Sequence, residues 1–291
     1  MGHPHRYVRD VSVQRSAAYG ADLVTYCVHF TINKVEVVLK IDSGCHESII
    51  NKKEWHKIGK PLLEPVLKKR RSVTGAEVPL LGQFIATVHY SGKIFHLPIQ
   101  VSANEDTRNL LGRRSFPILN LDWNKIFHRQ HTNEIIRGVL ALPHSDYMLS
   151  QARLASMCHA TTPFYVSIQV NTRFGMIMML DTGATQSKIS KRQWEILDKP
   201  RLRPSWVTIV DTANIPIPIL GECMLMVVYQ GLRRKVPVIV TRSEHMYAII
   251  GTNWFESFRF DFNRIFFDLK IHVRPSLTQP IQVQTTEDVK L

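Results

Sequence analysis

The chain has 291 residues, which corresponds to about two domains at ~150 residues each, and each would be long enough to bury a core of its own. Its 44% hydrophobic and 21% charged residues are near the averages of globular proteins, which excludes wholesale disorder and a fibrous composition. Lysine and arginine outnumber aspartate and glutamate by 37 to 24, and the net charge of +13 favours anionic partners without identifying one.

Residues 1–21 are interpreted as an N-terminal extension. Residues 1–20 are polar, are expected to be loose, and lack the apolar core of a secretory signal. The expected compartment is therefore the cytoplasm, with the nucleus as the alternative. The apolar runs fall short of the ~18 residues that cross a bilayer, so we expect no membrane partner. The four cysteines form no CxxC pair and are interpreted as reduced thiols, and we expect no metal site.

The chain then repeats itself without a gap at an offset of 139 residues. The repeat places lobe 1 at residues 22–128 and lobe 2 at residues 161–267. A linker at 129–160, expected to be partly helical, joins them, and a tail at 268–291 follows. The matched residues of lobe 1 include Asp42, Gly44, Ser48, Trp55, Gly82, Gly112, Asp122 and Asn124, which correspond in that order to Asp181, Gly183, Ser187, Trp194, Gly221, Gly251, Asp261 and Asn263.

Each lobe has the pattern of a mainly β structure, in which short β-branched or aromatic stretches alternate with Gly, Pro and Asn. Ser91-Gly92 and Gln230-Gly231 are turn dipeptides that predict a β-hairpin at matching places in the two lobes. The fold class is therefore all-β in the main. The expected helical exceptions are residues 51–58 and 191–197 and a short piece after Gly112 and after Gly251.

An apolar strand in each lobe ends in an Asp-Ser/Thr-Gly triplet, at residues 42–44 and at residues 181–183. One such triplet is weak support for a site, because Asp and Gly end strands in turns everywhere. Here both triplets are followed, 70 residues later, by two apolar residues and a glycine, Gly112 or Gly251. This combination resembles the retropepsin-type aspartic proteases of retroviruses and of Ty3/gypsy-like retrotransposons, and the resemblance spans both lobes.

The resemblance implies two retropepsin-like β-barrel lobes that form a pseudo-dimeric, single-chain acid-protease fold. It also implies a catalytic pair, Asp42 and Asp181, facing each other across a pseudo-dyad. Two carboxylates ~3 Å apart hold one proton between them, so one acts as base on a water and the other as acid. The implied activity is that of an aspartic endopeptidase, which acts on a polypeptide substrate, needs no cofactor, and works here as a monomer.

The neighbours of the two aspartates have supporting roles by the same resemblance. The hydroxyls of Ser43 and Thr182 would reach across to the backbone of the other lobe. Gly44 and Gly183 would let the backbone pass close to the carboxylates, where a Cβ would crowd the site. Strand alternation places Lys40 on the same face as Asp42, and a lysine aimed at the pair would depress its pKa and oppose activity.

Two further segments, residues 72–82 and 211–221, match the flaps that cover the substrate in this family. Their alternative interpretation is an ordinary surface hairpin. The tip residues expected to contact substrate are Thr74, Gly75 and Ala76 in lobe 1 and Ala213, Asn214 and Ile215 in lobe 2.

Two functions from different classes remain open at this point. The first is an endopeptidase derived from a retrotransposon, and the second is a catalytically silent retropepsin fold that binds peptides or proteins. The basic runs at residues 68–71 and 233–235 give weak support for nucleic acid as a partner, because such runs are usually solvated faces.

Overall fold

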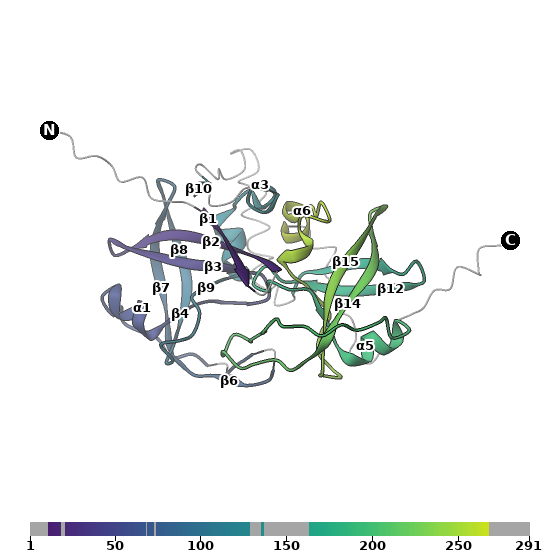
Figure 1. The fold of residues 1–291 in the computed structure, drawn as a ribbon. Coiled ribbons are helices and arrows are strands. Elements are labelled where there is room, and N and C mark those ends of the chain that lie inside the picture. The colour runs from purple at the N-terminus through teal and green to yellow at the C-terminus, as the bar shows by residue number, and fades with distance from the viewer. Residues whose placement is uncertain are drawn as a thin grey trace.

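A computed structural model describes residues 11–18, 21–67, 69–72, 74–128, 135–136 and 163–267. The described chain is mostly β and is arranged as two lobes that lie side by side, with α3 and α6 near their junction (Figure 1). The expectation of a mainly β fold with two barrel lobes is confirmed.

Lobe 1 is a six-stranded barrel in the order β2-β3-β9-β4-β8-β7, closed by pairing between β2 and β7. Strand β9 lies between β3, with which it pairs in parallel, and β4, with which it pairs antiparallel, so the end of β3 lies in the middle of the sheet. The strands are β2 (Ala21–Ile32), β3 (Val35–Asp42), β4 (Ser48–Asn51), β7 (Leu80–Tyr90), β8 (Lys93–Ser102) and β9 (Leu110–Gly112). The helices are α1 (Lys52–Lys57), η1 (Arg113–Ser115), α2 (Phe116–Leu119) and α3 (Trp123–Phe127).

Lobe 2 is a closed barrel in the corresponding order, β11-β12-β16-β13-β15-β14. Its strands are β11 (Tyr165–Val170), β12 (Phe174–Leu180), β13 (Lys188–Ile189), β14 (Ile219–Tyr229), β15 (Leu232–Thr241) and β16 (Ile249–Ile250). Its helices are α5 (Lys191–Ile196), η3 (Thr252–Trp254) and α6 (Phe262–Phe267). The predicted helices and the two predicted hairpins are therefore confirmed.

The two barrels match residue by residue. Lys40 pairs with Leu110 in lobe 1, and Met179 pairs with Ile249 in lobe 2, each 139 positions further along. Both long hairpins also contain a bulge at the same place, just before Gly82 and just before Gly221. The sequence offset thus corresponds to one strand register used twice.

The N-terminal segment departs from expectation. Strand β1 (Val11–Ala18) pairs along its whole length with β2, and β10 (Ile135–Ile136) pairs with β1. The prediction of a loose end is wrong for residues 11–18, because Val11 is fully buried and the unpaired edge of β2 accepts a further strand. Apart from residues 135–136, the linker at 129–160, which is expected to be partly helical, lies outside the described residues, and so does the tail at 268–291.

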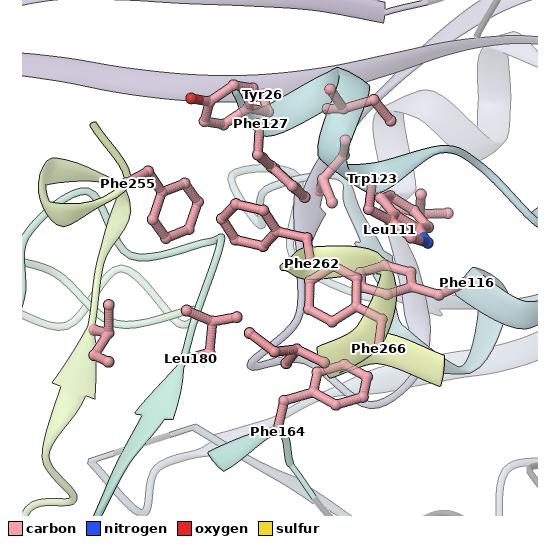
Figure 2. Close-up of a cluster of buried hydrophobic side chains, with 14 of the residues drawn as sticks. Tyr26, Leu111, Phe116, Trp123, Phe127, Phe164, Leu180, Phe255, Phe262 and Phe266 are labelled. Atoms are coloured by element: carbon pink, nitrogen blue, oxygen red, sulfur yellow. The ribbon is translucent and has the colours of Figure 1, made fainter. Parts of the chain in front are cut away.

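Aromatic side chains from both lobes fill the junction between them. Phe127 of α3 packs against Phe262 of α6, and Phe116, Phe164 and Phe266 extend the same cluster (Figure 2). Because these rings belong to one continuous buried core, the two lobes are packed as one body.

A polar contact beside this cluster is reciprocal. The side chain of Asn124 accepts a hydrogen bond from the Phe262 backbone N–H, and the side chain of Asn263 accepts one from the Trp123 N–H, both at 2.7 Å. Each asparagine also donates to the other lobe's aspartate, Asp261 or Asp122, at 2.9 Å. Each lobe therefore caps the other lobe's helix.

In the described part of the chain, none of the helices is long and apolar enough to cross a bilayer. Cys27, Cys45 and Cys223 are free thiols, while Cys158 lies outside the described residues.

Candidate active site

Strand pairing fixes the position of each aspartate. Asp42 is the last residue of β3 and lies opposite Gly112 of the parallel strand β9. Asp181 follows β12, and its backbone N–H donates to the carbonyl of Ile250 at 3.0 Å. Both carboxylates therefore leave the carboxyl end of a central strand and point toward the junction of the lobes.

The residues that follow the two aspartates bind each other across that junction. The backbone N–H of Ser43 donates to Thr182 Oγ1 at 2.9 Å, and the N–H of Thr182 donates to Ser43 Oγ at 3.0 Å. Ser43 Oγ in turn donates to the carbonyl of Leu180, and Thr182 Oγ1 donates to the carbonyl of Ile41. Both hydroxyls are fully buried, so these four hydrogen bonds hold the two loops in one geometry.

The two glycines place each carboxylate against the opposite lobe. A Cβ on Gly44 would lie 2.8 Å from Asp181 Cγ, and a Cβ on Gly183 would overlap the carboxylate of Asp42. Any side chain at either position would displace the other lobe's aspartate. The contact places both carboxylates at the centre of the junction.

The surroundings of Asp42 favour its protonated form. Its side chain is only 6% exposed, and burial followed by repulsion from Asp181 raises its pKa to about 7. Lys40, Arg113 and the N–H of Cys45, which donates to Asp42 Oδ1 at 2.8 Å, act in the opposite direction. The Oδ1 atom of Asp181 accepts backbone N–H groups of its own loop, from Gly183 and Ala184. The pair can therefore retain one proton near neutral pH.

Lys40 lies where strand alternation placed it. Its Nζ donates to the carbonyl of Gly183 in the other lobe at 2.7 Å, and burial lowers its pKa despite the attraction of Asp42. The prediction from the sequence did not extend to Lys188, a second lysine in the site that is only 5% exposed. Its signal was available, because Lys188 occupies the position that Ile49 holds in the other copy of the repeat.

Arg113 was also missed. This buried arginine follows Gly112 and donates through Nη1 to the carbonyls of Ser43 and Gly44, at 3.3 and 3.0 Å. These two hydrogen bonds hold the lobe 1 loop in place, and the charge of Arg113 lowers the pKa of Asp42. The corresponding residue of lobe 2 is Thr252, which donates to Val24 at 2.7 Å.

Cys45 lies beside Asp42 but is not an alternative nucleophile. Burial, followed by the charge of Asp42, raises the pKa of its thiol to about 12. The protonated thiol donates to the carbonyl of Glu47 at 3.1 Å. A thiolate mechanism therefore has no support at this position.

The two flap segments form the same turn. Gly75 N–H donates to Ser72 in flap 1, Asn214 N–H donates to Asp211 in flap 2, and both tip residues have positive φ, +87° and +62°. The tips also meet, because Thr74 Oγ1 donates to Asp211 Oδ2. Flap 1 contains the short strands β5 (Arg70–Arg71) and β6 (Glu77–Val78), whereas flap 2 has a single bridge between Val210 and Pro216.

A cavity of about 850 Å³ lies between the flaps and the two aspartates, and both carboxylates line it. Its roof is formed by the bases of the turns, Ser72 and Asp211, together with Val78 and Ile217. The residues predicted at the flap tips are not among those that line this cavity. Thr74 contacts Asp211, Asn214 donates to the carbonyl of Asp106, and Ala213 packs near Ile49, while Gly75, Ala76 and Ile215 complete the turns.

The comparison with protein-family models and the comparison with curated proteins both find no match for this chain. Solved structures do resemble parts of it. EIAV protease in an inhibitor complex aligns at 16% identity with a TM-score of 0.28, over 32% of this chain and 85% of that chain. The retroviral protease-like domain of Ddi1 from Leishmania major aligns at 27% identity and 0.25, over 32% and 71%. A retropepsin-like aspartic protease from Rickettsia conorii aligns at 17% identity and 0.25, over 35% and 73%.

Proposed function

We propose that this chain is an aspartic endopeptidase that hydrolyses peptide bonds at a single Asp42/Asp181 pair shared between its lobes. The observation that carries the proposal is the packing of each carboxylate against the other lobe's glycine, inside the reciprocal hydrogen bonds of Ser43 and Thr182. The equal strand registers of the two barrels support an origin by tandem duplication of one retropepsin-like unit, derived from a retrotransposon of the Ty3/gypsy type.

The chemistry follows from one proton held by two carboxylates. The ionised aspartate takes a proton from a bound water, and the resulting hydroxide attacks the carbonyl carbon of the peptide bond. The protonated aspartate donates to the carbonyl oxygen as negative charge develops there. Proton transfer to the nitrogen then releases the amine. The raised pKa of Asp42, about 7, keeps a proton available for this step over the acidic and near-neutral range.

The substrate is an extended polypeptide bound between the flaps and the two aspartates. The cavity of about 850 Å³ lies along strand-bearing flaps, which suits main-chain hydrogen bonding by an added strand. Both halves of the site lie on one chain, so a monomer is sufficient.

The decisive experiment compares the cleavage of a proteome-derived peptide library by Asp42→Asn, by Asp181→Asn and by wild type. General acid–base groups contribute ~100- to 10,000-fold, so each single variant should lose at least about 100-fold in turnover while retaining its melting temperature. The exposed aspartate Asp198, which pairs with Arg173, supplies the control variant Asp198→Asn, which should keep full activity. Substantial turnover by either active-site variant would refute a shared site.

A silent peptide-binding module is the second candidate, and one observation favours it. Lys40 and Lys188 place two cations near the aspartates, and a cation favours the loss of the shared proton. Wild-type protein that binds statine-containing peptides, mimics of the tetrahedral intermediate, without cleaving any library peptide would support this candidate over the protease.

A further inference from the structure

The floor of the cavity is a row of three neighbouring strand positions in each lobe. In lobe 1, Leu110 lies between Lys40 and Ile49, with which it pairs on its two sides. In lobe 2, Ile249 lies in the same way between Met179 and Lys188. All these residues line the cavity, and Leu110 and Ile249 are in addition almost fully buried. Each row therefore carries one lysine, but at opposite ends of the two rows.

The asymmetry brings the two ammonium groups to the same side of the site. Lys40 starts in lobe 1 and crosses the junction, because its Nζ donates to the carbonyl of Gly183 in the lobe 2 loop at 2.7 Å. Lys188 belongs to lobe 2, and Asp181 is the charge that it senses most strongly. The two lysines are also close enough for Lys40 to lower the pKa of Lys188. Together they form a positive pocket on the lobe 2 side of the aspartate pair.

Neither lysine is fully satisfied within the described chain. An ammonium group has three donors, and Lys40 uses one of them on Gly183. Lys188 is only 5% exposed, and its side chain makes no hydrogen bond or ion pair with any residue that the structure describes. Burial lowers the pKa of both side chains, which shows that nearby carboxylates do not compensate for the water they have lost. A buried cation in this state is stabilised by a further anion.

The charge balance of the cavity leaves room for that anion. With one proton on the aspartate pair, its single negative charge is opposed by two lysines. Arg71 and Arg108 also line the cavity and add positive charge, while Arg70 is paired with Glu47 at 3.5 Å. The other acidic groups are engaged, since Glu47 pairs with Arg114 and Asp211 accepts hydrogen bonds from the flap turns.

From this arrangement we infer that the cleft selects polypeptides that carry a Glu or Asp side chain close to the scissile bond, on one side only. The substrate carboxylate pairs with Lys40 and Lys188 in this pocket on the lobe 2 side. This inference names the substrate class of the proposed protease and therefore rests on that function for its meaning in catalysis. The pairing itself requires only that the cleft binds a peptide.

The test uses immobilised full-length protein and a library of eight-residue peptides centred on statine. Each flanking position contains Glu and Gln in equal amounts among other residues, and the bound fraction is sequenced. The repeat supplies matched variants, because lobe 2 has Met where lobe 1 has Lys40, and lobe 1 has Ile where lobe 2 has Lys188. Lys40→Met, Lys188→Ile and their combination are therefore compared with wild type and with the surface variant Lys235→Met.

Wild type and Lys235→Met should enrich Glu over Gln by about 10-fold at one or two adjacent positions on one side of the statine, as a charge-assisted bond of ~1.4 kcal/mol would give. Each single variant should reduce the enrichment, and the double variant should abolish it. Equal Glu and Gln, enrichment on both sides, or enrichment that persists in the double variant would overturn the inference. Should one of the variants fail to fold, the wild-type profile alone still decides, because a neutral pocket gives no one-sided Glu enrichment. Cleavage by wild type is measured separately, so one-sided enrichment without turnover would reject the protease and leave the acidic pocket standing.

Discussion

The two lobes are the same where they meet and different where they face the cavity. At the junction, Ser43 and Thr182 exchange equivalent hydrogen bonds, and so do Asn124 and Asn263. In the cavity, by contrast, Lys40 corresponds to Met179 and Ile49 corresponds to Lys188. Contacts across a pseudo-two-fold axis need both partners, so a change in one copy disturbs two loops. The cavity residues Lys40, Met179, Ile49 and Lys188 are not tied to their counterparts by such paired contacts, so each copy can differ.

The largest effect should come from breaking the symmetric part at Gly183. In Gly183→Ala, the new methyl group overlaps the carboxylate of Asp42 and must displace it. Displacing a reacting group by ~1 Å costs about 100-fold, so turnover should fall by at least that factor. The control is Gly175→Ala in β12, where an added Cβ meets no atom within 4 Å. Initial rates on one cleaved peptide measure both variants, and near-normal activity of Gly183→Ala would show that the glycine contact does not position Asp42.

The next effect concerns the contact between the lobes rather than the chemistry. Asn124→Ala and Asn263→Ala each remove the side-chain acceptor that caps a backbone N–H at the start of the other lobe's helix. Each change should lower the free energy of unfolding by about 1–3 kcal/mol, and by a similar amount in the two variants, because the contact is reciprocal. Urea denaturation measures both. A loss in one variant alone would mean that the two caps are not energetically equivalent.

The symmetric features are also those that the sequence predicts well. The paired triplets and the offset of 139 residues lead directly to the shared aspartates, the crossing hydroxyls and the equal registers of the barrels. Strand β1 was missed because residues 11–18 lie before residue 22, where the repeat begins, so the repeat carries no information about them. Arg113 and Lys188 do have counterparts, Thr252 and Ile49, but of a different residue type, so a comparison that looks only for matching residues passes over them.

The next prediction concerns Lys40 and the pH dependence of activity. Asp42 is faced by Asp181, Lys40, Arg113 and the Cys45 N–H, and of these Lys40 favours its ionised form most strongly. In Lys40→Met the ionised form loses this support, so the pKa of the pair should rise above about 7. Activity is lost when the last shared proton leaves, and the falling limb of kcat/KM should therefore move to higher pH, by up to about one unit.

The pH profile is recorded with a substrate that has no acidic residue near the scissile bond, so that the shift reports the aspartates and not the substrate. Lys191→Met, which removes an exposed lysine paired with Glu244, is the control and should leave the limb in place. A limb that stays fixed or moves to lower pH in Lys40→Met would contradict the assigned electrostatic role.

The smallest expected effect lies at the flap tips, where one side-chain hydrogen bond between the flaps has no equivalent in the opposite direction. Thr74 in flap 1 donates to Asp211 in flap 2, but the reciprocal bond is impossible, because the corresponding residues are Ala213 and Ser72. Thr74→Val keeps the shape and removes the donor, so the closed flaps should become less stable by the ~0.5–1.5 kcal/mol of a typical hydrogen bond. KM should rise about 3- to 10-fold while kcat changes little, since the tip lies away from the aspartates.

The exposed residue Thr87 of β7 provides the control Thr87→Val. A KM that is the same in Thr74→Val and in wild type would show that closure of the flaps does not depend on the contact between their tips.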